Sequence, residues 1–157
     1  MSAAPIRLGM ITPSSNTVLE PVTARLLRGR PDVSAHFARL RVTEISATPG
    51  SDAQFDAAPM LAAAELLADA RCHAICWNGT SASWLGIERD RELCAQIRAR
   101  TRIPATTAVL GLIEELRAAD VRRYALVTPY VDAVQSRIVE NLARDGFECV
   151  AESHLWL

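Results

Sequence analysis

Short apolar runs alternate along the chain with longer stretches in which apolar residues recur three and four positions apart. The short runs predict strands and the longer stretches predict helices, because side chains repeat every two residues on a strand and every 3.6 on a helix. The predicted strands are Ile6–Thr12, Val33–Val42, Ala74–Asn78, Ala105–Thr107, Tyr124–Thr128 and Cys149–Leu155. The predicted helices are Asn16–Arg28, Phe55–Ala70, Glu88–Arg100, Val109–Ala119 and Asp132–Arg144.

This strict alternation of strands and helices predicts an α/β fold with a parallel sheet covered by helices on both faces. In sheets of this kind, ligands bind beyond the carboxyl ends of the strands. We therefore expect a functional site in the turns that lead from a strand into the following helix.

The first strand and its helix have a counterpart near the end of the chain. Arg7–Pro13 (RLGMITP) and Arg123–Pro129 (RYALVTP) share Arg, Thr and Pro at the same places. The helices that follow stay in phase, since the apolar stripe Val18, Val22 and Leu26 corresponds to Val134, Ile138 and Leu142. We interpret this as an internal duplication. It predicts a first lobe at residues 1–116 and, at 117–157, the strand-helix-strand beginning of a second lobe that is truncated.

Composition narrows the class of protein. Half of the 157 residues are hydrophobic and 22% are charged, with a formal net charge of −1, which is typical of a globular domain. The near-neutral charge argues against a nucleic-acid partner. No apolar run approaches the ~20 residues that span a bilayer, and no secretory segment follows Met1. We therefore expect no membrane association and a cytoplasmic location.

The basic and sulfur-containing residues exclude several chemistries. All 17 basic residues are arginine, so a P-loop lysine and a Schiff-base lysine are both absent from this sequence. Cys72 and Cys76 stand along an extended run, where four residues span roughly 13 Å, and they make a poor zinc site. Cys94 lies on the apolar face of a predicted helix and is interpreted as a core residue. No metal site is expected.

Polar turns follow three of the predicted strands: Pro13–Thr17, Asn78–Ser83 and Thr128–Tyr130. Free backbone N–H groups at the start of a helix favour an anion. In the second turn, Gly79 permits close approach of a ligand to the backbone, and Thr80 and Ser81 add hydroxyl donors. This turn therefore predicts an anion site able to stabilise a carboxylate or an enediolate.

A serine hydrolase is a less favoured alternative for the same turn. Gly79–Ser83 differs by one residue from the nucleophile-elbow pattern G-x-S-x-G, but its final position is Ser83, whose side chain crowds the sharp turn. Only His154 lies downstream of the turn as a general base. A hydroxyl-lined anion site explains the sequence better.

Four segments carry a resemblance to a known family: RLGMITPSSNTVLEP, CHAICWNGTSASWLG, IPATTAVLGLIEELRAADVRRYALVTPYVDAVQ and GFECVAESHL. In order and spacing they resemble the aspartate/glutamate racemase superfamily, specifically its maleate cis-trans isomerase and arylmalonate decarboxylase branch. The resemblance implies two pseudo-symmetric flavodoxin-like lobes with the active site between them. It also implies cysteine chemistry on a small carboxylic acid without any cofactor.

When the resemblance is carried over to individual residues, it implies one set that binds the substrate and another set that is catalytic. Asn16 is expected to contact a substrate carboxylate, with Pro13 and Ser14 beside it, and Gly79 falls in the anion-binding turn. The residues expected to stabilise the reacting charge are Thr80, Ser81 and, from the start of the second lobe, Tyr130.

Two departures from the family pattern bear on the reaction. Gly79 stands where the racemases and maleate isomerases carry their first-lobe cysteine, and Cys76 has the opposite strand parity. This favours a decarboxylase-like arrangement with one cysteine in the second lobe. That cysteine is expected beyond Leu157, since Cys149 does not match its position.

The predicted function is thus a cofactor-independent isomerase or decarboxylase acting on a small mono- or dicarboxylic acid, incomplete in this chain. The alternative is a non-catalytic module for small-anion binding or oligomerisation. An unfinished parallel sheet leaves apolar surface to be covered, so we also expect a homo-oligomer.

Overall fold

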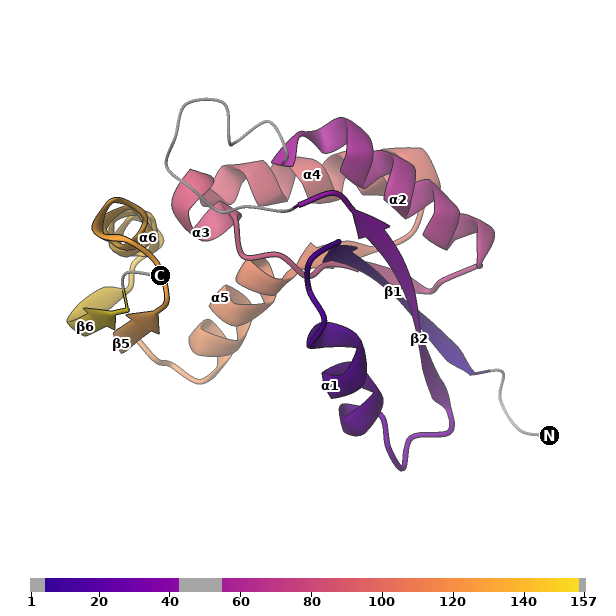
Figure 1. The fold of residues 1–157 in the computed structure, drawn as a ribbon, viewed down its shortest axis with the longest axis horizontal. Coiled ribbons are helices and arrows are strands. Elements are labelled where there is room, and N and C mark those ends of the chain that lie inside the picture. Colours follow the sequence, from indigo (N-terminus) through magenta and orange to yellow (C-terminus); the bar gives the residue numbers. More distant parts are fainter. Residues whose placement is uncertain (1–4, 43–54, 156–157) are drawn as a thin grey trace.

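The computed structural model describes residues 5–42 and 55–155 of the chain (Figure 1). The strands are β1 (Ile6–Pro13), β2 (Val33–Leu40), β3 (Ala74–Trp77), β4 (Ala105–Thr107), β5 (Arg123–Thr128) and β6 (Glu148–His154). The helices are α1 (Leu19–Leu26), α2 (Ala57–Asp69), α3 (Ala82–Leu85), α4 (Ile87–Thr101), α5 (Ala108–Ala118) and α6 (Asp132–Arg144). The α/β class predicted from the sequence is confirmed.

Four strands form a parallel sheet in the order β2-β1-β3-β4. Right-handed crossovers place α1 on one face of this sheet, and α2 and α4 on the other, as Figure 1 shows. The core lies on the α2 and α4 side, where Ile11, Ile75 and Trp77 are completely buried. The carboxyl ends of β1 and β3 therefore lie side by side at one edge of the core.

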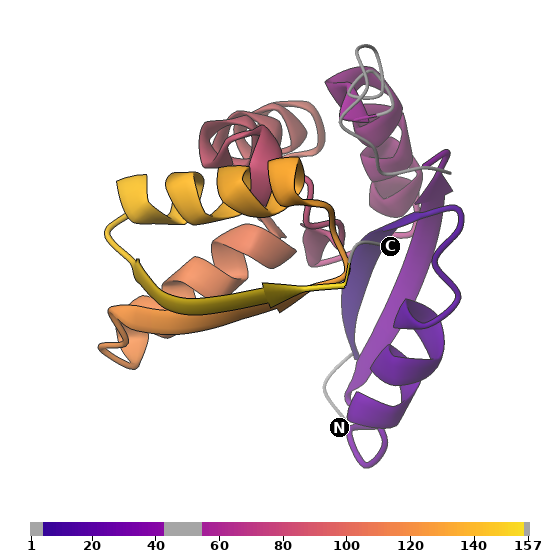
Figure 2. The ribbon, with the colours of Figure 1, turned by 60° about the vertical axis from the view of Figure 1, so that its left-hand side comes forward.

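The strands β5 and β6 form a separate two-stranded parallel sheet. In it, α6 returns the chain from β5 to β6, as α1 does between β1 and β2 in the larger sheet (Figure 2). The predicted boundary at residues 116 and 117 falls within α5 and stays a prediction.

The repeated apolar stripe is used differently in its two copies. In α6, Val134, Ile138 and Leu142 are buried, and the helix packs against α3 and β6. In α1, Val18 is 64% exposed and Leu26 is 76% exposed. The reason is packing: the main contact of α1 is with β2, and the residue that it buries is Thr23. The same apolar stripe is therefore buried in α6, whereas Val18 and Leu26 stay exposed at α1.

Two helices differ from the sequence prediction, α1 in its start and α3 in its presence. The predicted helix at Asn16–Arg28 begins only at Leu19, because Asn16 Oδ1 accepts hydrogen bonds from the backbone N–H groups of Val18 and Leu19, at 2.9 and 2.8 Å. The short helix α3 was not predicted, since four residues are too few for a periodic pattern.

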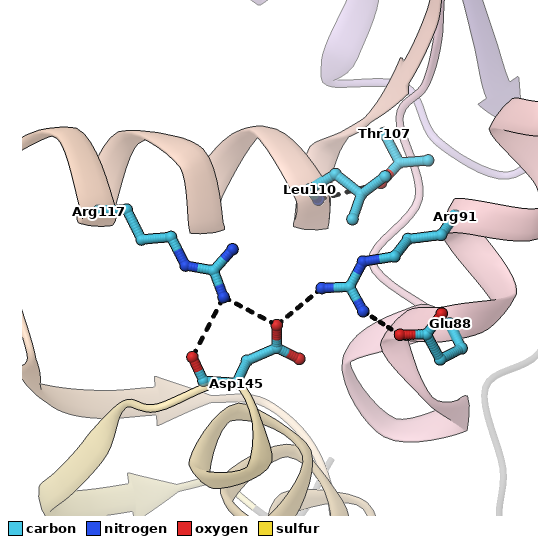
Figure 3. A network of polar contacts seen from close by, with 6 residues as sticks. All are labelled: Glu88, Arg91, Thr107, Leu110, Arg117 and Asp145. Atoms are coloured by element: carbon cyan, nitrogen blue, oxygen red, sulfur yellow. Dashed lines mark hydrogen bonds and ion pairs between the residues drawn. The ribbon is translucent and has the colours of Figure 1, made fainter.

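A network of charges joins α4, α5 and the end of α6 (Figure 3). Asp145 accepts hydrogen bonds from Arg91 of α4 at 2.8 Å and from Arg117 of α5 at 3.1 Å. Arg91 also pairs with Glu88, and the side-chain amide of Asn141 donates to the carbonyl of Ser83 at 3.0 Å. These contacts hold the β5-α6-β6 unit against the first sheet and its helices.

Candidate functional site

A cavity of about 520 Å³ opens where the turns after β1, β3 and β5 meet. Its lining comprises Pro13, Ser15, Asn16, Val42, Phe55, Trp77, Asn78, Gly79, Thr80, Ser81, Trp84, Pro129 and Tyr130. Six of the seven residues assigned from the sequence are among them: Pro13, Asn16, Gly79, Thr80, Ser81 and Tyr130. The fold thus brings together three polar turns that are far apart in the sequence.

The turn after β3 presents unused hydrogen-bond donors to this cavity. Within residues 5–42 and 55–155, the backbone N–H groups of Gly79, Thr80 and Ser81 have no acceptor. The turn leads into α3, a single helical turn, so a helix dipole contributes little here. The local N–H groups and hydroxyls provide the favourable field for an anion.

Thr80 and Tyr130 bring the turns after β3 and β5 into contact at the cavity. The Thr80 Oγ1 and Tyr130 hydroxyl oxygens lie 3.4 Å apart. The backbone N–H of Tyr130 donates to Thr128 Oγ1 at 3.3 Å, and its ring packs on Trp84 with 5.3 Å between centroids. Both ends of the tyrosine are therefore held, and its hydroxyl is positioned beside the turn after β3.

Polar residues of the turn after β1 hydrogen-bond to the backbone, and some of them also line the cavity. Ser14 does not line the cavity, and its hydroxyl exchanges hydrogen bonds with the backbone of Val42 at 3.2 and 3.3 Å, while the Ser15 hydroxyl donates to the Val42 carbonyl at 2.8 Å. Ser15 lines it instead, although the sequence assigned it no role. Asn16 also lines the cavity. Its Oδ1 accepts the N–H groups at the start of α1, and in the described residues its Nδ2 group has no acceptor. A free amide donor suits a carboxylate.

Aromatic residues form the wall of the cavity, and the sequence interpretation missed them. Trp84 lies 6.0 Å from Phe55 and 5.3 Å from Tyr130, measured between ring centroids, and Trp77 is also in the lining. The available signal was the position of Trp77 and Trp84 directly before and after the NGTSAS turn. Apolar walls lower the local dielectric constant, which strengthens the hydrogen bonds that a charged ligand accepts.

No cysteine lines this cavity in the described part of the chain. Burial raises the pKa of Cys76 to about 12, so its thiol stays protonated at neutral pH. Cys94 is buried in α4, as expected for a core residue, and burial raises its pKa to about 11.

Asp90 is a buried carboxyl group beside the site that the sequence analysis did not single out. It is 3% exposed and accepts a hydrogen bond from Thr107, whose Oγ1 in turn accepts the N–H of Leu110 at the start of α5. Burial raises the pKa of Asp90 to about 6, and the Thr107 hydrogen bond opposes that shift. It lines a second cavity of about 170 Å³, which shares Ser81 with the first.

His154 lies elsewhere, in a cavity lined by Asp132 and Glu152 among other residues. Its Nδ1 pairs with Glu152 at 3.0 Å and its Nε2 pairs with Asp132. These hydrogen bonds, that to Glu152 foremost, raise the pKa of the imidazole. Ser81 and His154 share no cavity, so the geometry gives the serine-hydrolase alternative no support.

In 5–42 and 55–155, no cluster of three or more His, Cys, Asp or Glu side chains is suited to hold a metal ion. The helices of those same ranges include none with the length and apolar character of a membrane span.

Known proteins have similar sequences. Residues 8–157 match the model of the family described as arylmalonate decarboxylase. The chain is 28% identical over 153 residues to a maleate isomerase of Pseudomonas putida, covering 90% of this chain and 60% of that protein. It is 30% identical over 140 residues to an arylmalonate decarboxylase of Bordetella bronchiseptica, covering 88% and 56%.

The fold is shared as well. The crystal structure of the maleate isomerase Iso from Pseudomonas putida S16 superposes with a TM-score of 0.86 at 26% identity, over 97% of this chain and 64% of that one. The chain thus spans about 60% of the length of the curated relatives it matches. With a family match over nearly its whole length and the same fold, the chain belongs to the arylmalonate decarboxylase family.

Proposed function

We propose that this chain forms the anion-binding part of a cofactor-independent isomerase or decarboxylase that acts on a small mono- or dicarboxylic acid. The observation that supports this most directly is the turn after β3. Its backbone N–H groups at 79–81 have no acceptor among the described residues, and they lie beside the Thr80 and Tyr130 hydroxyls, 3.4 Å apart.

These donors suit a ligand whose negative charge grows during the reaction. When a malonate-type acid loses carbon dioxide, the electron pair of the broken bond passes into the remaining carboxyl group as an enediolate. Donors that are already oriented stabilise such charge without reorganising. Thr80, Ser81 and Tyr130 have this role in our proposal.

A second anchor holds the substrate in one orientation. Asn16, in the turn after β1, lines the same cavity as the donors after β3, and its Nδ2 group has no acceptor in the described residues. A dicarboxylate bound to both turns would have one carboxylate on Asn16 and the other in the 79–81 turn. Fixing both ends aligns the reacting bond and reduces the entropy that must be lost at the transition state.

The relatives supply the candidate substrates. Some are named maleate isomerases and one is named arylmalonate decarboxylase. Maleate and aryl-substituted malonates both carry two carboxylates on a short carbon skeleton, and an aromatic wall favours the aryl compounds.

The test is a titration of the chain with malonate, maleate and phenylmalonate, followed through the amide NMR signals of residues 79–81. We expect saturable shifts of these signals, and Thr80→Ala should weaken binding about tenfold or more. Thr101→Ala, at the end of α4 and outside the cavity, is the control. Shifts that are absent, or equal in the wild type and Thr80→Ala, contradict the proposal.

A second candidate function is anion binding without turnover. The observation that favours it is that the cavity lining contains no cysteine in the described residues. Assays of the three acids for product separate the candidates: binding with turnover supports the enzyme, and binding alone supports the module. We also propose a homo-oligomer, which sedimentation at micromolar concentration tests.

A further inference from the structure

Trp77 and Gly79 are in unusually close contact at the end of β3. A Cβ atom added to Gly79 would lie 2.1 Å from Cζ2, 2.5 Å from Cε2 and 2.8 Å from Cη2 of the Trp77 ring. Carbon atoms in contact are normally separated by about 3.5 to 4 Å. While the indole stays where it is, position 79 has no room for any side chain.

The indole is not free to move aside. Trp77 is 0% exposed, and its register neighbours, Ile11 in β1 and Thr107 in β4, are buried as well. Because neighbouring residues in register point to the same face of a parallel sheet, all three side chains lie in the packed layer under α2 and α4. Displacing a large ring from such a layer requires the surrounding core to repack.

Packing alone does not account for tryptophan at this position. Its Nε1–H group is buried and has no hydrogen-bond partner in the described part of the chain. A buried N–H without an acceptor is unfavourable, and such groups call for an explanation. Nε1 is bonded to Cε2, one of the atoms that occupy the space above Gly79. The same ring that carries this penalty also closes position 79.

We propose that Trp77 is a specificity-determining residue that keeps position 79 free of any side chain. This inference rests on the proposed function, since it concerns the same cavity. Trp77 acts through Gly79 and is therefore a positioning residue. Its ring keeps the N–H groups of residues 79–81 accessible to an anion and prevents the first-lobe turn from carrying a thiol or any other proton-transfer group. The turn is thereby restricted to hydrogen bonding, and the site to one-thiol chemistry.

The experiment is a double-mutant cycle with a matched control. Gly79→Cys, Trp77→Leu and the Trp77→Leu/Gly79→Cys pair are compared with Gly111→Cys, a glycine in α5 with open space around its Cβ position. Three properties are measured: the urea unfolding equilibrium, the binding of malonate, and the rate at which iodoacetamide alkylates the introduced thiol, with and without malonate. If a variant with Gly79→Cys or Trp77→Leu does not fold, the milder substitutions Gly79→Ala and Trp77→Phe give an equivalent double-mutant cycle.

We expect Gly79→Cys to lower the unfolding midpoint and to weaken malonate binding at least tenfold, whereas Gly111→Cys lowers neither the midpoint nor the affinity. With Trp77→Leu present, Gly79→Cys should be tolerated. The unfolding equilibrium constant of the double variant should then be at least tenfold smaller than the value that the two single effects predict if they add. In the pair, malonate should slow alkylation of the thiol at position 79.

Additive effects in the cycle, or a Gly79→Cys variant as stable as Gly111→Cys, would overturn the proposal. A role of Trp77 in filling the core only would give additive destabilisation and no rescue. If the wild-type chain does not bind malonate, the proposed function fails, but the unfolding cycle still decides whether Trp77 closes position 79. The two failures are therefore distinguishable.

Discussion

The hydroxyl oxygens of Thr80 and Tyr130 lie 3.4 Å apart, although 50 positions separate the two residues in the sequence. Thr80 follows a strand of the four-stranded sheet, and Tyr130 follows a strand of the two-stranded one. Their meeting means that the site depends on how the two sheets are held together, as well as on the turns themselves.

The first prediction concerns the tyrosine hydroxyl. Tyr130→Phe keeps the ring that packs on Trp84 and removes only the donor, so malonate binding should weaken about tenfold. Isothermal calorimetry measures the change. The chain's other tyrosine provides the control: Tyr124→Phe, in β5 and outside the cavity lining, should leave the affinity unchanged. Equal affinities of wild type and Tyr130→Phe would remove Tyr130 from the site.

The second prediction concerns the contact between α4, α5 and α6. The side chain of Asp145 is 12% exposed and serves both Arg91 and Arg117. Asp145→Asn should lower the free energy of unfolding by about 1–2 kcal/mol, because it removes the charge that two guanidinium groups share. Urea denaturation measures this value.

A matched carboxylate in the same chain provides the comparison. The side chain of Asp120 is 91% exposed and pairs with Arg122 at 3.6 Å. Asp120→Asn should change stability by less than about 0.5 kcal/mol, as exposed ion pairs usually do. Similar effects of the two substitutions would argue against the network of Figure 3 as a structural link.

The third prediction is a pH dependence caused by Asp90. Burial raises the pKa of this carboxyl in the folded chain from 3.8 to about 6, so between those values the folded state binds more protons than the unfolded state. The free energy of unfolding should therefore decrease as pH rises from about 4 to about 6, by up to roughly 2–3 kcal/mol. Denaturation curves over this range measure the slope.

Asp90→Asn should abolish that slope and make the chain more stable than the wild type above pH 6. The amide oxygen can still accept the hydrogen bond of Thr107, so the start of α5 stays capped. Asp69→Asn, at the exposed end of α2, is the control that leaves the slope in place. An unchanged slope in Asp90→Asn would assign the pH dependence to another group.

The fourth prediction concerns a glycine inside a helix. Gly111 lies within α5, and an added Cβ atom would meet no other atom within 4 Å. Gly111→Ala should raise stability by about 0.5–1 kcal/mol, because alanine loses less backbone entropy in a helix. Gly146→Ala should do the opposite, since Gly146 has a φ of +92° that alanine adopts only with strain. Thermal unfolding of both variants tests the contrast.

Much of the fold could be predicted because its signals are local. The alternation of apolar runs and amphipathic stretches gives β1, α2, β3, α4 and α6 within a few residues, and parallel pairing follows from that order. The NGTSAS turn could be singled out from its glycine and hydroxyls alone, and Asn78, Gly79, Thr80 and Ser81 line the cavity. The start of α1 could not be placed, because a single side-chain amide shifts it.

The parts that sequence did not predict depend on contacts between distant segments. Whether the stripe on α1 is buried depends on what lies against it, and the same pattern on α6 is buried. The aromatic wall forms only when Phe55, Trp84 and Tyr130 come together from three elements. The close contact of Trp77 with Gly79 depends on a side-chain conformation that no pattern of residue types specifies.

Asn16 belongs both to the start of α1 and to the lining of the cavity. Its Oδ1 accepts hydrogen bonds from the backbone N–H groups of Val18 and Leu19, and the residue also lines the cavity. Because α1 packs mainly on β2 and leaves Val18 and Leu26 exposed, its stability depends strongly on that cap. A ligand that fixes the amide also fixes the cap, so binding and helix formation become linked equilibria, each favouring the other by the same free energy. A ligand in the cavity would thus stabilise α1 through Asn16, without contact to the exposed face of the helix.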